Sequence, residues 1–395
     1  LLPLVWGMLL GIFAGIIATR LPQGLGVRRA EQQKASAIIQ VAVLIFVADL
    51  ALLVGAALPK LIQSGWALVF QELGHFLGTI IIALPLALLL GIKREAVGAT
   101  YSVGREPNLA IIGEKYGMSS PEGRGVLAEY VTGTVVGAVF ISVLASLIAS
   151  TGLFNPLALA MGAGVGSGSM MAAATGGIVA QSPSGMAHDI AAFAAASNLI
   201  TTTIGTYFTL FISLPLANFI YRTLEPMIGR KAVTGQPDAN LSVHDAKEIA
   251  IGWGTMVGLL AIVAFIALVA GNWITYKTAP QAALLGTVII VAVAAVGATL
   301  ARFLPVKIPA VFWATLIGMA LTAPFWPGAH MMTVLTGKMH FLALATVVLT
   351  YAGMSLAKDI PLFKALGWRI VLVSLVANAG TFIFASLIAE VTLPK

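Results

Sequence analysis

The sequence contains no cysteine and very few charged residues. Only 9% of its 395 residues are Asp, Glu, Lys or Arg, whereas an ordinary soluble domain has about 25%. The missing cysteines exclude disulfide bonds, thiolate metal sites and a cysteine nucleophile. The pattern His-Glu-x-x-His is also missing, so a zinc hydrolase has no support. The sequence as a whole is 59% hydrophobic and has a mean hydropathy of +0.99. This composition predicts an all-α, polytopic membrane protein.

Basic residues give a formal net charge of +7, but they stand in short segments between apolar runs. A nucleic-acid partner is therefore not expected, because such proteins gather their basic residues on one face. Apolar runs of about 20 residues are interpreted as membrane spans. The runs are 1–19, 36–58, 66–90, 97–117, 124–150, 155–181, 187–222, 248–271, 280–301, 308–327, 339–357 and 367–391.

Lysine and arginine are abundant in alternate loops, which places both termini on the non-cytoplasmic side of the membrane. The alternation requires 97–117 and 155–181 each to cross, although a pair of re-entrant hairpins would give the same pattern. Both segments are too polar or too rich in glycine for ordinary spans. We therefore expect a bundle of about 10–12 spans.

Two parts of the sequence are repeated. Segment 65–87 aligns without gaps on 367–389, and the preceding spans follow loosely. Identical residues, each matched 302 positions later, are Gly65, Trp66, Val69, Leu73, Gly78, Thr79, Ile81, Ala83 and Ala87. The two copies run in opposite directions in the expected topology, as inverted repeats of transporters do. Chance similarity between Gly/Ala/Leu-rich helices is the alternative.

The middle of the chain repeats more weakly, since 101–123 resembles 164–185. Each copy is a glycine-interrupted segment followed by a Ser-Pro-x-Gly turn and a long helix. We expect one membrane domain over 1–395, divided into a scaffold, a core, a cytoplasmic loop and a second scaffold half. The four parts are 1–96, 97–222, 223–247 and 248–395.

Segment 161–179, MGAGVGSGSMMAAATGGIV, lacks the Leu, Ile and Val of a lipid-facing helix. Its glycines make a helix interruption inexpensive, and a half-helix that begins near Ser169 would point free N–H groups at a ligand. The predicted ligand-binding residues here are Gly166, Ser167, Gly168, Ser169 and Thr175. A continuous helix whose glycines serve close packing is the alternative.

Segment 103–108, VGREPN, places Pro107 and two charged residues near the middle of a span. A charge at that depth is costly, so it faces the protein interior and has a partner. Arg105 is expected to pair with an anionic substrate because guanidinium and carboxylate bind in a bidentate manner, with Gly104 and Asn108 beside it. Alternatively, this segment is a cytoplasmic loop.

Four titratable residues are candidates for ion or proton coupling. Asp49 lies within an apolar run and would be costly without a partner. Glu129, His188 and Asp189 follow the two Ser-Pro-x-Gly turns, and acids in a first helical turn are also favoured by the helix dipole alone. Both interpretations stay open.

Other polar residues have weaker assignments. Glu72 and His75 share a helix face but are expected to be solvated near the outer interface. Asn198 and Thr201 belong to a polar stripe that either lines the substrate cavity or bonds neighbouring helices. Asn378 is expected to be a packing contact.

The two glycine-rich segments, GAGVGSGSMMAAATGG and VGREPNLAIIG, resemble the discontinuous helices of a broad transporter superfamily. It comprises bile-acid, glutamate, 2-hydroxycarboxylate and ketodeoxygluconate permeases together with cation/proton antiporters. The chain is also similar to an uncharacterised bacterial family of polytopic membrane proteins, which supplies no substrate. The resemblance implies inverted repeats and sodium- or proton-coupled carriage of small organic anions by a core that moves against a scaffold.

We therefore expect a secondary active transporter of a small organic anion in the bacterial inner membrane, and not an enzyme. A cation/proton antiporter is the main alternative, followed by a channel or an intramembrane enzyme. No cofactor or metal is expected apart from sodium as a coupling ion. The expected partners are the anionic substrate and the lipid bilayer. The sequence does not determine the oligomeric state, for which a homodimer is the candidate.

Overall fold

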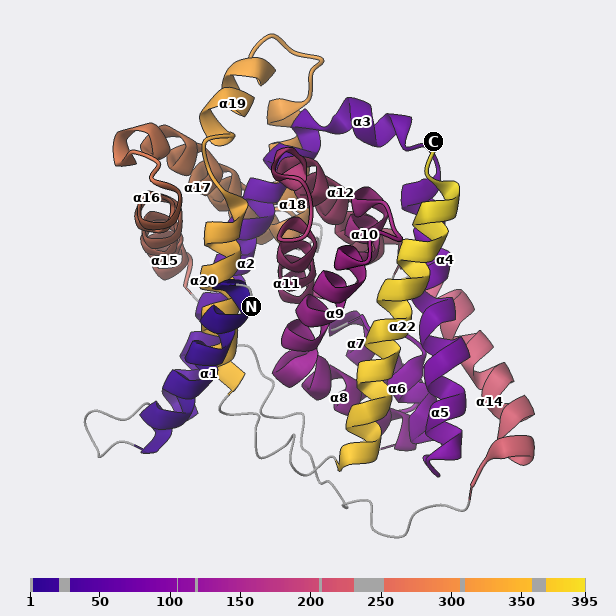
Figure 1. The fold of residues 1–395 in the computed structure, drawn as a ribbon. Coiled ribbons are helices and arrows are strands. Elements are labelled where there is room, and N and C mark those ends of the chain that lie inside the picture. Colours follow the sequence, from indigo (N-terminus) through magenta and orange to yellow (C-terminus); the bar gives the residue numbers. More distant parts are fainter. Residues whose placement is uncertain are drawn as a thin grey trace. The chain divides into compact units, whose positions relative to one another are not determined.

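The computed structural model describes residues 3–20, 29–104, 106–117, 120–205, 208–230, 252–305, 310–356 and 367–394. Within these ranges every regular element is a helix (Figure 1). Those of them that are long and apolar enough to cross a membrane are Ala67–Leu89, Pro121–Ser150, Trp253–Tyr276, Pro280–Phe303 and Trp368–Thr392. Composition therefore predicted the right class, a helical protein with apolar helices of membrane length.

The chain divides into two compact units that interleave in sequence. Unit 1 comprises Leu1–Ser64, Ser182–Leu199 and Glu248–Ala357, and unit 2 comprises Gly65–Gln181, Ile200–Lys247 and Lys358–Lys395. The sequence repeat suggests that 65–87 and 367–389 both belong to the scaffold. In the structure their helices belong to unit 2, together with both glycine-interrupted segments.

Unit 1 is built from long helices that meet at small residues. The helices are α1 (Pro3–Arg20), α2 (Arg29–Ala56), α3 (Leu58–Gln63), η3 (Ser184–Met186), α12 (Ala187–Ile200, whose last residue belongs to unit 2), α15 (Trp253–Ala264), η7 (Phe265–Gly271), α16 (Asn272–Tyr276), α17 (Pro280–Phe303), α18 (Ala310–Thr322), α19 (Ala329–Thr336) and α20 (Phe341–Leu356). Where α2 meets α18, Gly55 lies against Thr322, whose hydroxyl donates to the carbonyl oxygen of Leu52 at 2.7 Å.

Unit 2 contains shorter helices and more interruptions. Its helices are α4 (Ala67–Gly78), η1 (Thr79–Ala83), α5 (Leu84–Leu89), α6 (Glu95–Thr100), α7 (Glu106–Lys115), α8 (Pro121–Thr132), η2 (Gly133–Gly137), α9 (Ala138–Ser150), α10 (Pro156–Ala163), α11 (Gly168–Val179), η4 (Thr201–Gly205), η5 (Thr209–Ser213), α14 (Leu214–Ile228) and α22 (Trp368–Thr392). The segments η1, η2, η4 and η5 are π-helical. Such widened turns often mark functional sites.

The helices α4 and α22 pack backbone against backbone and run in opposite directions (Figure 1). A Cβ on Gly78 would overlap the carbonyl oxygen of Gly380, and a Cβ on Gly380 would overlap the carbonyl oxygen of Gly78. The ungapped alignment of 65–87 with 367–389 matches these two glycines. The contact is therefore reciprocal between matched residues.

A second close approach joins α6 to α8, where a Cβ on Gly98 would overlap the carbonyl oxygen of Glu122. Two ion pairs hold the same helices together. Arg94 contacts Glu122 at 2.5 Å, and Arg124 contacts Glu95 at 2.7 Å. These carboxylates are mostly buried, while both arginines are about one-third exposed. The pairs fix the start of α6, which leads into the first interruption of unit 2.

The α4–α22 contact makes a stability prediction. Gly380→Ala forces a methyl group into a backbone contact, so we expect it to destabilise the protein by about 1–3 kcal/mol, the usual cost of overpacking. The measurement is thermal unfolding of the purified protein in detergent. Gly258→Ala on α15 is the matched control, because no atom lies within 4 Å of its Cβ position and alanine favours helix. Equal melting temperatures for the two variants would contradict the prediction.

Candidate functional site

Two helical segments of unit 2 are interrupted inside one apolar core. Residues 101–104 lie between α6 and α7, and residues 164–167 lie between α10 and α11. Val103 and Val165, one from each interruption, are buried members of the same core cluster. Non-helical backbone is stable in such a place only where protein or a polar cavity satisfies it. The interruptions at 101–104 and 164–167 are therefore where a candidate site is sought.

The 164–167 interruption ends in a capped helix. Gly166 adopts φ +101°, and α11 then begins at Gly168. The Ser167 hydroxyl oxygen accepts the N–H of Met170 at 3.3 Å and lies 3.1 Å from the hydroxyl oxygen of Ser169. Two hydroxyl groups and the positive end of the α11 dipole therefore meet here.

Thr175 lies further along α11 with 2% of its surface exposed. Its hydroxyl has no hydrogen-bond partner among the described residues. A buried hydroxyl without a partner is costly, so Thr175 is a polar group that a ligand or water would satisfy.

The 101–104 interruption is held by side chains at both ends. The Tyr101 hydroxyl donates to the carbonyl oxygen of Asn108 at 2.8 Å, and the Ser213 hydroxyl donates to the Tyr101 carbonyl oxygen. The Gly104 N–H donates to the Ser102 hydroxyl oxygen at 3.1 Å. Asn108 is 2% exposed, and its side-chain Nδ2 has no hydrogen-bond partner among the described residues.

The glycine at 104 makes room for that amide, since a Cβ there would stand 3.0 Å from Asn108 Oδ1. The structure thus brings Gly104 and Asn108 together. Arg105, the predicted guanidinium, lies outside the described residues.

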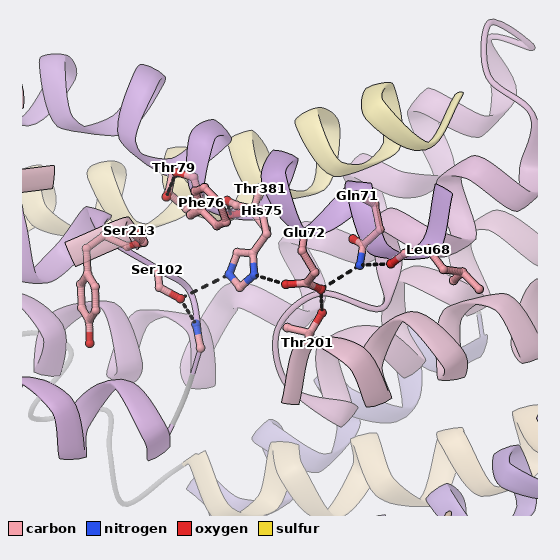
Figure 2. Close-up of polar contacts among 12 residues, drawn as sticks. Leu68, Gln71, Glu72, His75, Phe76, Thr79, Ser102, Thr201, Ser213 and Thr381 are labelled. Carbon is pink, nitrogen blue, oxygen red and sulfur yellow. Dashed lines mark hydrogen bonds and ion pairs between the residues drawn. The ribbon is translucent and has the colours of Figure 1, made fainter. Parts of the chain in front are cut away.

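A chain of buried polar side chains leads from the 101–104 interruption into α4 (Figure 2). His75 Nε2 lies 3.3 Å from the Ser102 hydroxyl oxygen, and His75 Nδ1 lies 3.4 Å from Glu72 Oε2. Glu72 Oε1 accepts the Gln71 amide at 2.7 Å and also accepts the Thr201 hydroxyl. Each of these five residues is less than one-tenth exposed.

The hydrogen-bond directions in this chain are mutually consistent. With its proton on Nδ1, His75 donates to Glu72 and leaves Nε2 free to accept the Ser102 hydroxyl. The Ser102 oxygen in turn accepts the Gly104 N–H. One proton arrangement therefore satisfies every group from Glu72 to the 101–104 interruption.

Glu129 lies beside the 164–167 interruption. It is 1% exposed, and its Oε1 lies 3.4 Å from Asn378 Nδ2 on α22. A Cβ on Gly133 would stand 3.5 Å from Glu129 Oε1 and 4.0 Å from the sulfur of Met170, in the first turn of α11. Asn378 is thus a partner of a buried carboxylate and more than a packing contact.

The helix-dipole interpretation of Glu129 is wrong, because α8 begins at Pro121 and its first-turn acid is Glu122. For Asp189 that interpretation agrees with the structure, which places it in the first turn of α12. Asp189 also contacts Lys60 at 2.7 Å and 2.9 Å.

Three of the four coupling candidates lie in unit 1. His188 and Asp189 line a pocket of about 150 Å³ together with Lys60. Asp49, on α2, is 2% exposed, and its Oδ2 has no hydrogen-bond partner among the described residues. Asn198 is buried on α12, in the same unit. The predicted residues are thus divided between the units: these four in unit 1, and the remaining described ones in unit 2.

The most connected part of the site is not evident from the sequence. The expectation that Glu72 and His75 are solvated is wrong, since they are 2% and 3% exposed. Their i, i+3 spacing showed that they share a helix face. The burial of that face depends on α22, whose Thr381 hydroxyl donates to the His75 carbonyl oxygen at 3.2 Å.

Comparison with known proteins gives a family without an assigned activity. A family model described as "Protein of unknown function (DUF3100)" matches residues 1–223. The match covers more than half of the chain, so the protein belongs to this family. No curated protein and no solved structure matches the chain.

The two glycines near Met170 make a prediction about the 164–167 interruption. A Cβ on Gly166 would meet Met170 at 3.8 Å and one on Gly137 at 3.5 Å, both ordinary contacts. Only Gly166 has a positive φ. We therefore expect Gly166→Ala to cost about 1–3 kcal/mol through backbone strain, whereas Gly137→Ala is neutral or stabilising. Thermal unfolding in detergent measures both, and equal stability of the two variants would show that 164–167 is not held in this conformation.

Proposed function

We propose that this protein is a secondary active transporter of a small organic anion, embedded in the bacterial inner membrane. The observation that carries the proposal is the pair of interruptions at 101–104 and 164–167, which share one buried core within a helical, apolar unit. Transporters of small solutes form their binding sites from discontinuous helices of this kind.

The chemistry of the interruptions favours a negatively charged solute. Ser167 and Ser169 supply hydroxyl groups at the positive end of the α11 dipole. Asn108 contributes an amide nitrogen without a hydrogen-bond partner among the described residues. Arg105, proposed from the sequence, adds the bidentate group that fits a carboxylate. The Glu129 carboxylate lies near the first turn of α11 and would repel an anionic substrate. Anion binding there therefore requires that a cation or a proton neutralise Glu129.

The contact between Gly78 and Gly380 supports an internal repeat within unit 2. Equivalent residues of two antiparallel copies touch each other reciprocally. A two-fold axis through the contact would produce this arrangement. Inverted repeats related by such an axis underlie many secondary transporters, so the packing is consistent with alternating access by one repeat-built unit.

A cation/proton antiporter is the second candidate. Asp49 favours it, because a buried carboxylate oxygen without a hydrogen-bond partner among the described residues is suited to bind a cation or proton. In that case unit 1 carries an ion site of its own, and the interruptions of unit 2 need not bind an organic anion.

Thermal stability of the purified protein with small carboxylates separates the two functions. The panel contains succinate, citrate, glutamate and gluconate, each with and without sodium. A ligand that binds only the folded state adds about 2.7 kcal/mol at a hundred times its dissociation constant. We expect one anion to raise the melting temperature, and we expect Arg105→Ala and Ser167→Ala to abolish the rise.

Ser150→Ala is the matched control, because Ser150 is exposed at the end of α9 and its hydroxyl donates to the carbonyl oxygen of Leu147 in the same helix. Stabilisation by sodium or pH alone, lost in Asp49→Asn, would favour the antiporter. Anion stabilisation that survives both Arg105→Ala and Ser167→Ala would contradict the proposed site.

A further inference from the structure

We infer that Glu72 and His75 together bind the proton that drives transport, and that Ser102 transmits their protonation to the 101–104 interruption. This inference rests on the proposed transport function and assigns its coupling ion. It also assigns the coupling site to α4, in the same unit as the interruptions, whereas the candidates Asp49, His188 and Asp189 belong to unit 1.

Burial is the first reason. The two side chains are 2% and 3% exposed, and their facing atoms, Glu72 Oε2 and His75 Nδ1, are 3.4 Å apart. Among the described residues no lysine or arginine contacts either side chain. In an apolar interior an uncompensated charge is costly. A carboxylate beside a neutral imidazole carries one negative charge, and one added proton brings the pair to zero net charge.

In the part of the chain that the structure describes, no charged residue contacts the Glu72–His75 pair. Three uncharged residues from other segments bond Glu72 or His75. They are Thr201 on η4, Thr381 on α22 and Ser102 in the 101–104 interruption. The other elements packed on α4, namely α10, η1 and η5, contain no titratable residue. The charged residues of α22 lie at its ends, where Arg369 stacks on Trp368 and Glu390 accepts the N–H of Asn155.

Glycine at position 205 provides space for the carboxylate. A Cβ there would stand 3.0 Å from Glu72 Oε2. Gln71 and Thr201 hold the other oxygen, Oε1, so Oε2 is the atom that faces both the imidazole and this space. The carboxyl group can therefore keep its bonds through Oε1 while a proton is exchanged at Oε2.

Ser102 connects the proton to the proposed anion site. When His75 is neutral with its proton on Nδ1, the Ser102 hydroxyl donates to Nε2. When the pair gains a proton at Nε2, the Nδ1 proton passes to Glu72 Oε2, so that the carboxyl group becomes protonated and Nε2 becomes a donor. The Ser102 oxygen then accepts from Nε2 as well as from the Gly104 N–H. The Ser102 hydrogen is then released and can donate toward an anion. Proton binding thus adds a donor and removes negative charge, and both changes favour anion binding.

The test uses protons alone, so it does not depend on knowing the substrate. Infrared difference spectra of the purified protein between about pH 5 and about pH 8, the range in which histidine titrates, report carboxyl protonation. We expect a protonated-carboxyl band that is lost in Glu72→Gln and shifted in His75→Gln. The band should persist in Glu390→Gln, the matched control on α22. A band unchanged in Glu72→Gln would overturn the inference.

Transmission to the interruptions is measured with a thiol probe, because the chain contains no cysteine. The labelling rate of Ser169→Cys by a methanethiosulfonate reagent is divided by that of exposed Ser150→Cys, which removes the intrinsic pH dependence of the thiol. We expect this ratio to change severalfold with pH. Adding Glu72→Gln or Ser102→Ala should abolish the change, while Ser102→Ala keeps the infrared band. A ratio with the same pH dependence in all backgrounds would overturn the inference.

Two further results have defined meanings. Covalent labelling of Ser102 by a fluorophosphonate would overturn the inference, because it would show an activated nucleophile in a Ser–His–Glu arrangement. A pH-dependent ratio without any anion-dependent stabilisation would reject the proposed anion transport but retain Glu72 and His75 as a proton site. Anion stabilisation without a pH-dependent labelling ratio would support the proposed anion transport but reject Glu72 and His75 as the coupling proton site.

Discussion

The hydrogen-bonding requirement of polar groups in an apolar interior is the constraint on which this structure depends. Helices satisfy it locally, and so the described residues form helices almost throughout. The exceptions are informative because each needs other partners. At 101–104 the hydroxyl groups of Ser102 and Ser213 bond backbone groups, and the Tyr101 hydroxyl donates to the carbonyl oxygen of Asn108 in α7. At 164–167 the N–H groups of Gly164 and Val165 bond carbonyl oxygens of α10, and the Ser167 hydroxyl caps α11. Side chains therefore supplement the backbone bonds at both interruptions.

Close helix packing is the second condition for such a site. Gly78 and Gly380 bring the backbones of α4 and α22 into direct contact, and Gly98 does the same for α6 against α8. In lipid the hydrophobic effect does not drive helices together, so van der Waals contact between small residues has to do so. These contacts enclose Glu72 and His75, whose polar atoms must then bond to one another and to Ser102, Gln71 and Thr201.

This enclosure relates the proposed anion site to the proposed proton site. The same short stretch, 101–104, contributes Ser102 to the buried acid–base chain and Gly104 to the space around Asn108. A change in protonation at His75 alters which hydrogen bonds Ser102 can make. Coupling would then need no long pathway, since one serine belongs to both networks.

The sequence by itself determined the helical class and the presence of apolar helices of membrane length, because these depend on local composition. It also matched Gly78 with Gly380, although not their contact. Only the tertiary structure decided that Glu72 and His75 are buried, that Asn378 is a partner of Glu129, and that 65–87 and 367–389 belong with the interrupted segments. Polarity along one helix does not reveal which neighbouring helix covers it, so burial and hydrogen-bond partners followed from packing between residues distant in sequence.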